Sequence, residues 1–144
     1  MDRHISITTN NTPVSIRFES GLMVYDEALY EGRYLARYWS TSGQIMPEMH
    51  LASEGFLKKA DGFPLGSFLV SVNGHSLNNF TLMEQGEAPD DSGLFTTSQA
   101  KVWKTKLRSL EVDLEVTVCT RLDGGSFLVR WLELVNHSDR PIGI

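Results

Sequence analysis

The sequence contains a single cysteine, Cys119, among its 144 residues. One thiol cannot form an intramolecular disulfide or a thiolate metal cluster, so neither can stabilise the fold. Long apolar runs are also missing, because no stretch approaches the roughly 20 residues that span a bilayer. The N-terminal residues 1–10 lack the uninterrupted apolar core of a signal peptide. We therefore expect a cytoplasmic protein that makes no membrane contact.

Basic residues are fewer than acidic ones, with 13 Lys plus Arg against 18 Asp plus Glu and a formal net charge of −5. A nucleic-acid-binding face needs a clustered basic stripe, so nucleic acid is not an expected partner. Apolar residues make up 41% and charged residues 22%, which is ordinary for a soluble globular protein. We expect residues 1–144 to form one domain, because a chain of this length can bury a useful core.

Two long runs dominate the second half of the chain. Apolar and polar residues alternate over 110–118, and this period of two predicts a strand with one buried face. The following residues 123–125, Asp-Gly-Gly, tolerate positive φ and predict a tight hairpin. The return run 127–135 is apolar on both faces apart from Arg130 and Glu133. It predicts an interior strand that is covered on both sides.

The register of this hairpin depends on the length of its turn. A two-residue turn at 123–124 would place Val116 opposite Trp131. A three-residue turn would set Glu115 against Glu133, and like charges directly opposite each other are unfavourable. We predict the two-residue turn.

Trp131 is expected in the core, because its strand is apolar on both faces and its neighbours are rich in Val and Leu. The same argument predicts burial of Leu114, Val116 and Val118. Cys119 lies between Val118 and Thr120 in the first strand of the hairpin, where a small packed residue is the usual interpretation.

Further short strands are predicted along the chain. Turn-forming residues at 10–13 separate the first two, and Asn73-Gly74 is a strong signal for a type I′ hairpin. The acidic run 84–93 is typical of a mobile loop. The expected strands cover 5–9, 14–19, 22–25, 67–72 and 102–107.

The segment 30–39 fits two structures. Its three tyrosines recur every four residues, as one helix face would require. Alternation and aromatic enrichment favour a strand over 33–39, and Gly32 would weaken a helix by about 1 kcal/mol. We prefer the strand. The best helical candidate is 47–59. The fold class predicted from all these elements is an all-β, antiparallel β-sandwich with little helix.

The sequence contains no recognisable pattern of catalytic residues. The four histidines are far apart, and no pair has metal-ligand spacing. Phosphate-cradling glycine motifs and nucleophile elbows are missing. We assign no catalytic residue, metal or cofactor. Aromatic side chains can stack on sugar rings, and for Tyr38 and Trp39 both core packing and sugar contact stay open. These two are the candidate substrate-binding residues.

One segment resembles a known family. Residues 120–142 read Thr-Arg-Leu-Asp-Gly-Gly-Ser-Phe-Leu-Val-Arg-Trp-Leu-Glu-Leu-Val-Asn-His-Ser-Asp-Arg-Pro-Ile. This run resembles the N-terminal β-domain of the melibiase-like α-galactosidases of glycoside hydrolase family 36. Residues 68–77, a hydrophobic strand that reaches an Asn-Gly turn, are similar to an earlier hairpin of that domain. Together the resemblance covers roughly the second half of the chain.

The resemblance implies a two-sheet super-sandwich, of the galactose-mutarotase-like type, placed before a (β/α)8 catalytic barrel. It implies hydrolysis of terminal α-galactosides with retention, by two carboxyl groups about 5 Å apart and without a metal or cofactor. Those carboxyl groups belong to the barrel. We therefore expect 1–144 to be a noncatalytic N-terminal excerpt. Such an excerpt would leave strand edges and an apolar patch uncovered, so we expect it to dock on the rest of its own chain or to self-associate as a homo-oligomer. The alternative is a free-standing carbohydrate-binding or subunit-interaction β-domain.

Overall fold

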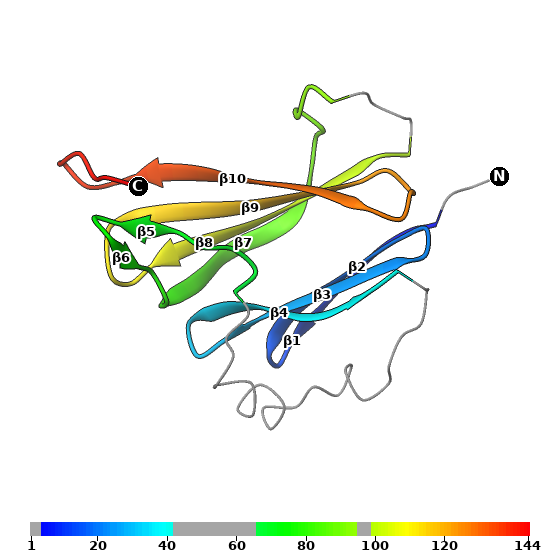
Figure 1. The fold of residues 1–144 in the computed structure, drawn as a ribbon, viewed down its shortest axis with the longest axis horizontal. Coiled ribbons are helices and arrows are strands. Elements are labelled where there is room, and N and C mark those ends of the chain that lie inside the picture. The colour runs from blue at the N-terminus through cyan, green and yellow to red at the C-terminus, as the bar shows by residue number, and fades with distance from the viewer. Residues whose placement is uncertain (1–3, 42–65, 95–98) are drawn as a thin grey trace.

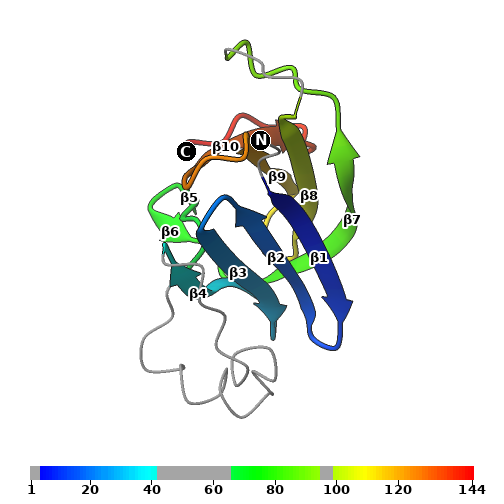
Figure 2. The same ribbon diagram turned by 90° about the vertical axis from the view of Figure 1, so that its right-hand side faces the viewer.

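The computed structural model describes residues 4–41, 66–94 and 99–144. Within these ranges all helix or strand structure is β-strand, and every strand pair is antiparallel. Two four-stranded sheets lie face to face as a sandwich (Figures 1 and 2). The all-β sandwich predicted from the sequence is confirmed. The helix expected at 47–59 lies outside the described residues.

The N-terminal sheet is a meander with the order β1-β2-β3-β4. The strands predicted at 5–9, 14–19 and 33–39 are confirmed, and the strand predicted at 22–25 continues to Tyr30. The Thr12–Pro13 peptide bond between the first two strands is cis. The strand bounds are β1 (Ile5–Asn11), β2 (Val14–Ser20), β3 (Met23–Tyr30) and β4 (Arg33–Ser40).

The C-terminal sheet has the order β10-β9-β8-β7. Its strands are β7 (Phe80–Ala88), β8 (Lys101–Ser109), β9 (Leu114–Leu122) and β10 (Leu128–Asn136). The loop predicted for 84–93 is wrong over its first five residues, which belong to β7. Lysines on β8 explain the difference, because Lys106 and Lys101 lie 3.0 Å and 3.7 Å from the carboxylates of Glu84 and Glu87. Opposite charges on neighbouring strands make an acidic sequence compatible with pairing.

A small hairpin lies at one end of the sandwich (Figure 1). It consists of β5 (Ser71–Val72) and β6 (His75–Ser76). Asn73 and Gly74 have φ values of 51° and 81°, as the predicted type I′ turn requires. The strand expected over 67–72 is wrong for 67–70, which are irregular.

The register predicted for β9 and β10 is wrong. Residues 123–127 form a five-residue connection, so Val116 pairs with Leu134 and Trp131 pairs with Cys119. β9 also begins only at Leu114, because 110–113 form a bend between β8 and β9.

Contacts with the opposite sheet explain the longer connection. The Ser20 hydroxyl, at the end of β2, accepts a hydrogen bond from Gly124 N at 3.0 Å and donates one to Gly125 O at 2.7 Å. These bonds hold the loop across the open end of the sandwich. The observed register also keeps Glu115 away from Glu133.

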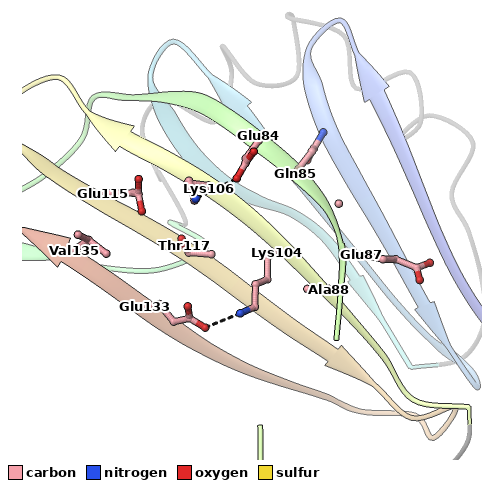
Figure 3. Close-up of a pocket in the computed structure, with 11 residues that line it drawn as sticks. Glu84, Gln85, Glu87, Ala88, Lys104, Lys106, Glu115, Thr117, Glu133 and Val135 are labelled. Carbon is pink, nitrogen blue, oxygen red and sulfur yellow. Dashed lines mark hydrogen bonds and ion pairs between the residues drawn. The ribbon is translucent and has the colours of Figure 1, made fainter. Parts of the chain in front are cut away.

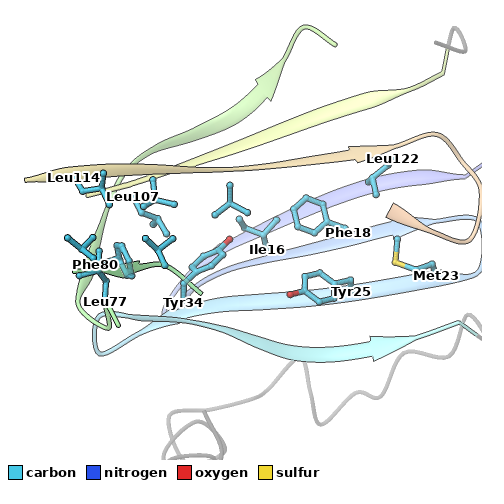
Figure 4. Close-up of a cluster of buried hydrophobic side chains, with 14 residues drawn as sticks. Ile16, Phe18, Met23, Tyr25, Tyr34, Leu77, Phe80, Leu107, Leu114 and Leu122 are labelled. Atoms are coloured by element: carbon cyan, nitrogen blue, oxygen red, sulfur yellow. The ribbon is translucent and has the colours of Figure 1, made fainter. Parts of the chain in front are cut away.

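The core lies between the two sheets (Figure 4). Leu114, Val116 and Val118 are at most 1% exposed, which confirms their predicted burial. The core residues that Figure 4 labels are Ile16, Phe18, Met23, Tyr25, Tyr34, Leu77, Phe80, Leu107, Leu114 and Leu122.

Trp131 is not part of this core, so its predicted burial between layers is wrong. β10 is an edge strand rather than an interior one. Trp131 pairs with Cys119, and both side chains therefore point to the outer face of the C-terminal sheet. Leu134 and Val135 further along β10 are 39% and 44% exposed. Only the inner face of this apolar strand is covered by the opposite sheet.

Candidate functional site

A groove of about 440 Å³ crosses the outer face of the C-terminal sheet (Figure 3). Lys104 and Lys106 are two residues apart on β8, so both side chains leave the sheet on this face. We call this feature the outer groove. Its lining residues are Glu84, Gln85, Gly86, Glu87, Ala88, Lys104, Lys106, Glu115, Thr117, Glu133 and Val135.

Ion pairs connect the side chains that line the outer groove. Lys104 Nζ donates a hydrogen bond to Glu133 Oε1 at 2.9 Å and lies 3.7 Å from Asp91. Lys106 Nζ lies 3.0 Å from Glu84. Four glutamates and two lysines line the groove, so the lysines compensate only part of its negative charge.

Glu133 is the residue on which most of these contacts converge. Besides Lys104, its Oε1 accepts bonds from Cys119 Sγ and Trp131 Nε1, each at 3.4 Å. The hydrogen bond from Lys104 holds the pKa of Glu133 below its usual value. The same bond raises the pKa of Lys104. Glu133 is therefore a carboxylate and Lys104 a cation at neutral pH.

This electrostatic arrangement suits hydrogen bonding better than acid catalysis. A glycosidase general acid needs a raised pKa so that it carries a proton at working pH. The pKa of Glu133 moves in the opposite direction. Within the described ranges, no group of three or more His, Cys, Asp or Glu side chains could hold a metal ion. In the same residues no helix is long and apolar enough to cross a membrane.

A second polar cluster lies between the sheets. Arg130 of β10 reaches Glu27 of β3, with NH1 at 2.6 Å from Oε2 and NH2 at 2.8 Å from Oε1. Two planar groups joined by parallel hydrogen bonds form a strong, directional pair. The side chain of Glu27 is fully buried and that of Arg130 is 15% exposed. This pair therefore connects the two sheets inside the protein.

Hydroxyl groups complete the environment of this pair. Tyr34 and Ser67 each donate to Glu27 at 2.5 Å. Burial and the charge of Glu27 raise the pKa of Tyr25 to about 12 and that of Tyr34 well above its usual value. Burial alone would lower the pKa of Arg130, but the charge of Glu27 raises it. The polar groups of this cluster thus bond one another inside the protein, as expected for a structural role.

The outer face of the N-terminal sheet carries a buried ionic triad. Asp26 lies between two arginines, with Arg37 Nε at 2.5 Å from Oδ1 and Arg17 NH2 at 3.2 Å from Oδ2. All three side chains are less than 10% exposed. The triad borders a cavity of about 220 Å³.

The structure places the two candidate substrate-binding residues on opposite faces of β4. Trp39 pairs with Tyr25 and is 52% exposed, and the two rings meet edge to face at 5.6 Å. Tyr38 pairs with Asp26 and is half-buried. Neighbouring residues of a strand point in opposite directions, so these rings do not form one stacking platform.

The described histidines do not come together. His4, His75 and His137 each lie near one glutamate, at 3.2, 3.9 and 3.5 Å. His50 lies outside the described residues. Cys119 is fully buried, which confirms the small packed residue expected there. Burial and the neighbouring Glu133 raise the pKa of its thiol to about 12, so it is a poor nucleophile.

Comparison with known proteins found no family model that matches the chain and no curated protein that matches it. The resemblance of residues 120–142 to the α-galactosidase sandwich therefore remains a prediction.

The sequence contained a pattern that indicates part of the outer face of the C-terminal sheet. Lys104 and Lys106 on one strand, and Trp131 and Glu133 on another, are each spaced by two and so share a face. The apolar residues around Trp131 obscured this pattern, because they indicated that both faces of the strand are buried. No local pattern could have joined Glu27 to Arg130, which are 103 residues apart.

Proposed function

We propose that residues 1–144 are the noncatalytic N-terminal sandwich segment of an α-galactosidase-like glycoside hydrolase. The parent enzyme would hydrolyse terminal α-galactosides with retention, and its catalytic carboxyl groups would lie in a barrel outside this segment. The observation that carries the proposal is the resemblance of residues 120–142. The two-sheet antiparallel sandwich is the fold that this resemblance implies.

The geometry of the turn after β10 gives that motif a physical basis. Asn136 Oδ1 accepts hydrogen bonds from the backbone and hydroxyl of Ser138, at 3.0 and 2.6 Å, and its Nδ2 donates to Arg140 O at 2.8 Å. An asparagine that bonds its own following backbone fixes a turn. The turn follows directly on Asn136, the last residue of β10. The asparagine at the end of the 120–136 run thus has a structural role.

The acidic residues of the outer groove support the noncatalytic part of the proposal. Lys104 and Lys106 hold Glu133 and Glu84 in ion pairs. The lowered pKa of Glu133 makes this residue unsuitable as the protonated acid. A retaining glycosidase needs such an acid and a nucleophile about 5 Å apart.

The exposed edge of the C-terminal sheet supports docking on the rest of the parent chain. The other edge strand, β7, is acidic, ion-paired to β8 and interrupted by a bulge near Leu82, which are features that protect an edge. β10 instead leaves Leu134 and Val135 exposed. We expect the following chain to cover this edge.

Two experiments test the proposal. Purified 1–144 should not hydrolyse an aryl α-galactoside above the buffer rate, and turnover that vanished with one Asp or Glu substitution would contradict its noncatalytic role. The reading frame beyond codon 144 should continue into alternating strand and helix patterns over several hundred residues. A stop codon directly after codon 144 would contradict the parent enzyme.

One observation favours the alternative of a carbohydrate-binding domain. Trp39 is a large aromatic residue with half of its surface open to solvent. A single exposed ring can stack on the apolar face of a sugar. Binding of a saccharide that is lost in Trp39→Ala would favour this second function.

A further inference from the structure

Trp131 borders a second cavity on the outer face of the C-terminal sheet. The cavity has a volume of about 340 Å³, and Asp91, Ser92, Leu94 and Glu133 complete its lining. Glu133 also lines the outer groove, so the two hollows share a wall. We call this second feature the Trp131 cavity.

The loop that forms one wall of the Trp131 cavity is anchored to the sheet. Arg121 Nε donates to Asp90 Oδ2 at 2.8 Å, and both side chains are almost completely buried. Asp90 Oδ1 accepts bonds from the backbone and hydroxyl of Ser92, at 3.2 and 2.6 Å. The wall opposite Trp131 is therefore held in place before any ligand arrives, which lowers the entropic cost of binding.

The polar atoms of the Trp131 cavity leave both donors and acceptors for a ligand. The bonds that Glu133 accepts from described residues all end on Oε1, so its Oε2 is open as an acceptor. The carboxylate of Asp91 is 66% exposed and meets Lys104 only at 3.7 Å. Lys104 lines the adjoining outer groove and meets the cavity at Glu133, to which one of its three N–H groups donates.

The charged groups and the aromatic ring together indicate which class of ligand fits the cavity. Lys104 stands between two carboxylates, so a phosphate or another anion would meet net negative charge. A sugar hydroxyl can accept from the lysine and donate to a carboxylate at the same time. The indole ring of Trp131 offers the apolar surface on which the C–H face of a pyranose can stack.

We propose that the Trp131 cavity is a noncatalytic binding site for a neutral pyranose oligosaccharide, with Trp131 as the stacking surface. Glu133 and Asp91 of its lining, and Lys104 at the edge of the adjoining outer groove, are the hydrogen-bonding groups. This site goes beyond the proposed function and does not require a catalytic barrel. Only the choice of an α-galactoside as the first probe rests on that function.

The test is a titration of the full chain 1–144 followed by the NMR signals of its three indole N–H groups. Each signal is assigned from single Trp→Phe variants. Raffinose and maltotriose are added separately. We expect the Trp131 signal to shift in a saturable way with at least one of them, with a dissociation constant on the order of 1 mM. The signals of Trp39 and Trp103 should stay in place.

Substitutions distinguish the Trp131 cavity from sugar binding elsewhere on the molecule. Trp131→Ala should weaken binding about tenfold or more, whereas Trp39→Ala should leave it unchanged. If Trp131→Ala fails to fold, Glu133→Gln changes an exposed side chain of the same cavity and should also weaken saccharide binding. Glu87→Gln on β7 is its matched control and should leave binding unchanged. Binding of maltotriose but not raffinose would keep the site and count against an α-galactoside as substrate.

Two results would overturn the inference. The first is the lack of any saturable shift at Trp131 with both saccharides. The second is a shift at Trp39 that persists in folded Trp131→Ala.

Discussion

At the scale of single residues, the ion pair between Glu27 and Arg130 is the most consequential contact in the protein. Glu27→Ala would leave a buried guanidinium without its partner. We expect a loss of about 3–5 kcal/mol in the free energy of unfolding, measured by urea denaturation. Glu87→Gln, which removes an exposed pair with Lys101, should cost less than about 1 kcal/mol. The double variant Glu27→Met/Arg130→Met should recover part of the loss. A cost below about 1 kcal/mol for Glu27→Ala would contradict a stabilising role for the pair.

Trp131 gives a second residue-scale prediction. Because its ring lies on the outer face of an edge strand, Trp131→Ala should cost only about 1–2 kcal/mol. Leu122→Ala, which empties a fully buried position in the neighbouring strand, should cost about 2–5 kcal/mol. Denaturant melts of both variants decide the question. Equal losses would mean that Trp131 belongs to the core after all.

At the scale of elements, the connection between β9 and β10 depends on Ser20. Ser20→Ala removes two hydrogen bonds to the 123–127 loop and leaves the Gly124 amide without its acceptor. We expect a loss of about 1–3 kcal/mol in the free energy of unfolding and faster hydrogen exchange at Gly124. Ser126→Ala is the matched control in the same loop, because the Ser126 hydroxyl accepts a bond from Leu22 N and does not contact Gly124 N. Unchanged exchange at Gly124 in Ser20→Ala would count against this role.

The elements also show what the sequence could predict. Strands with alternating residues, such as 14–19 and 33–39, and the Asn73-Gly74 turn follow from local chemistry, and their predictions are confirmed. The predicted β9–β10 register is wrong because Ser20 sets the connection from another sheet. The second half of β7, residues 84–88, was predicted as a loop because its acidic residues are compensated only by lysines on the neighbouring strand β8. The candidate site could not be predicted for the same reason, since its residues come together only when strands distant in sequence pair.

At the scale of the whole molecule, alkaline pH should unfold the sandwich through its buried tyrosines. The folded pKa of Tyr25, about 12, lies above its value of about 10 in an unfolded chain. Its contribution to stability is therefore complete below pH 10 and is lost as the pH rises from about 10 to 12. Urea melts across this range should show the decline. In Tyr25→Phe the free energy of unfolding should fall less steeply with pH over this range. An unchanged pH dependence in that variant would exclude Tyr25 as a cause.

We propose that this sandwich is part of a larger α-galactosidase-like enzyme. The most direct test is immunodepletion of a lysate of the source cells with an antibody raised against residues 1–144. We predict that the antibody removes a polypeptide several hundred residues longer than this segment, together with the activity on an aryl α-galactoside. Removal of a 16.2 kDa polypeptide alone, with the activity left in solution, would contradict this proposal.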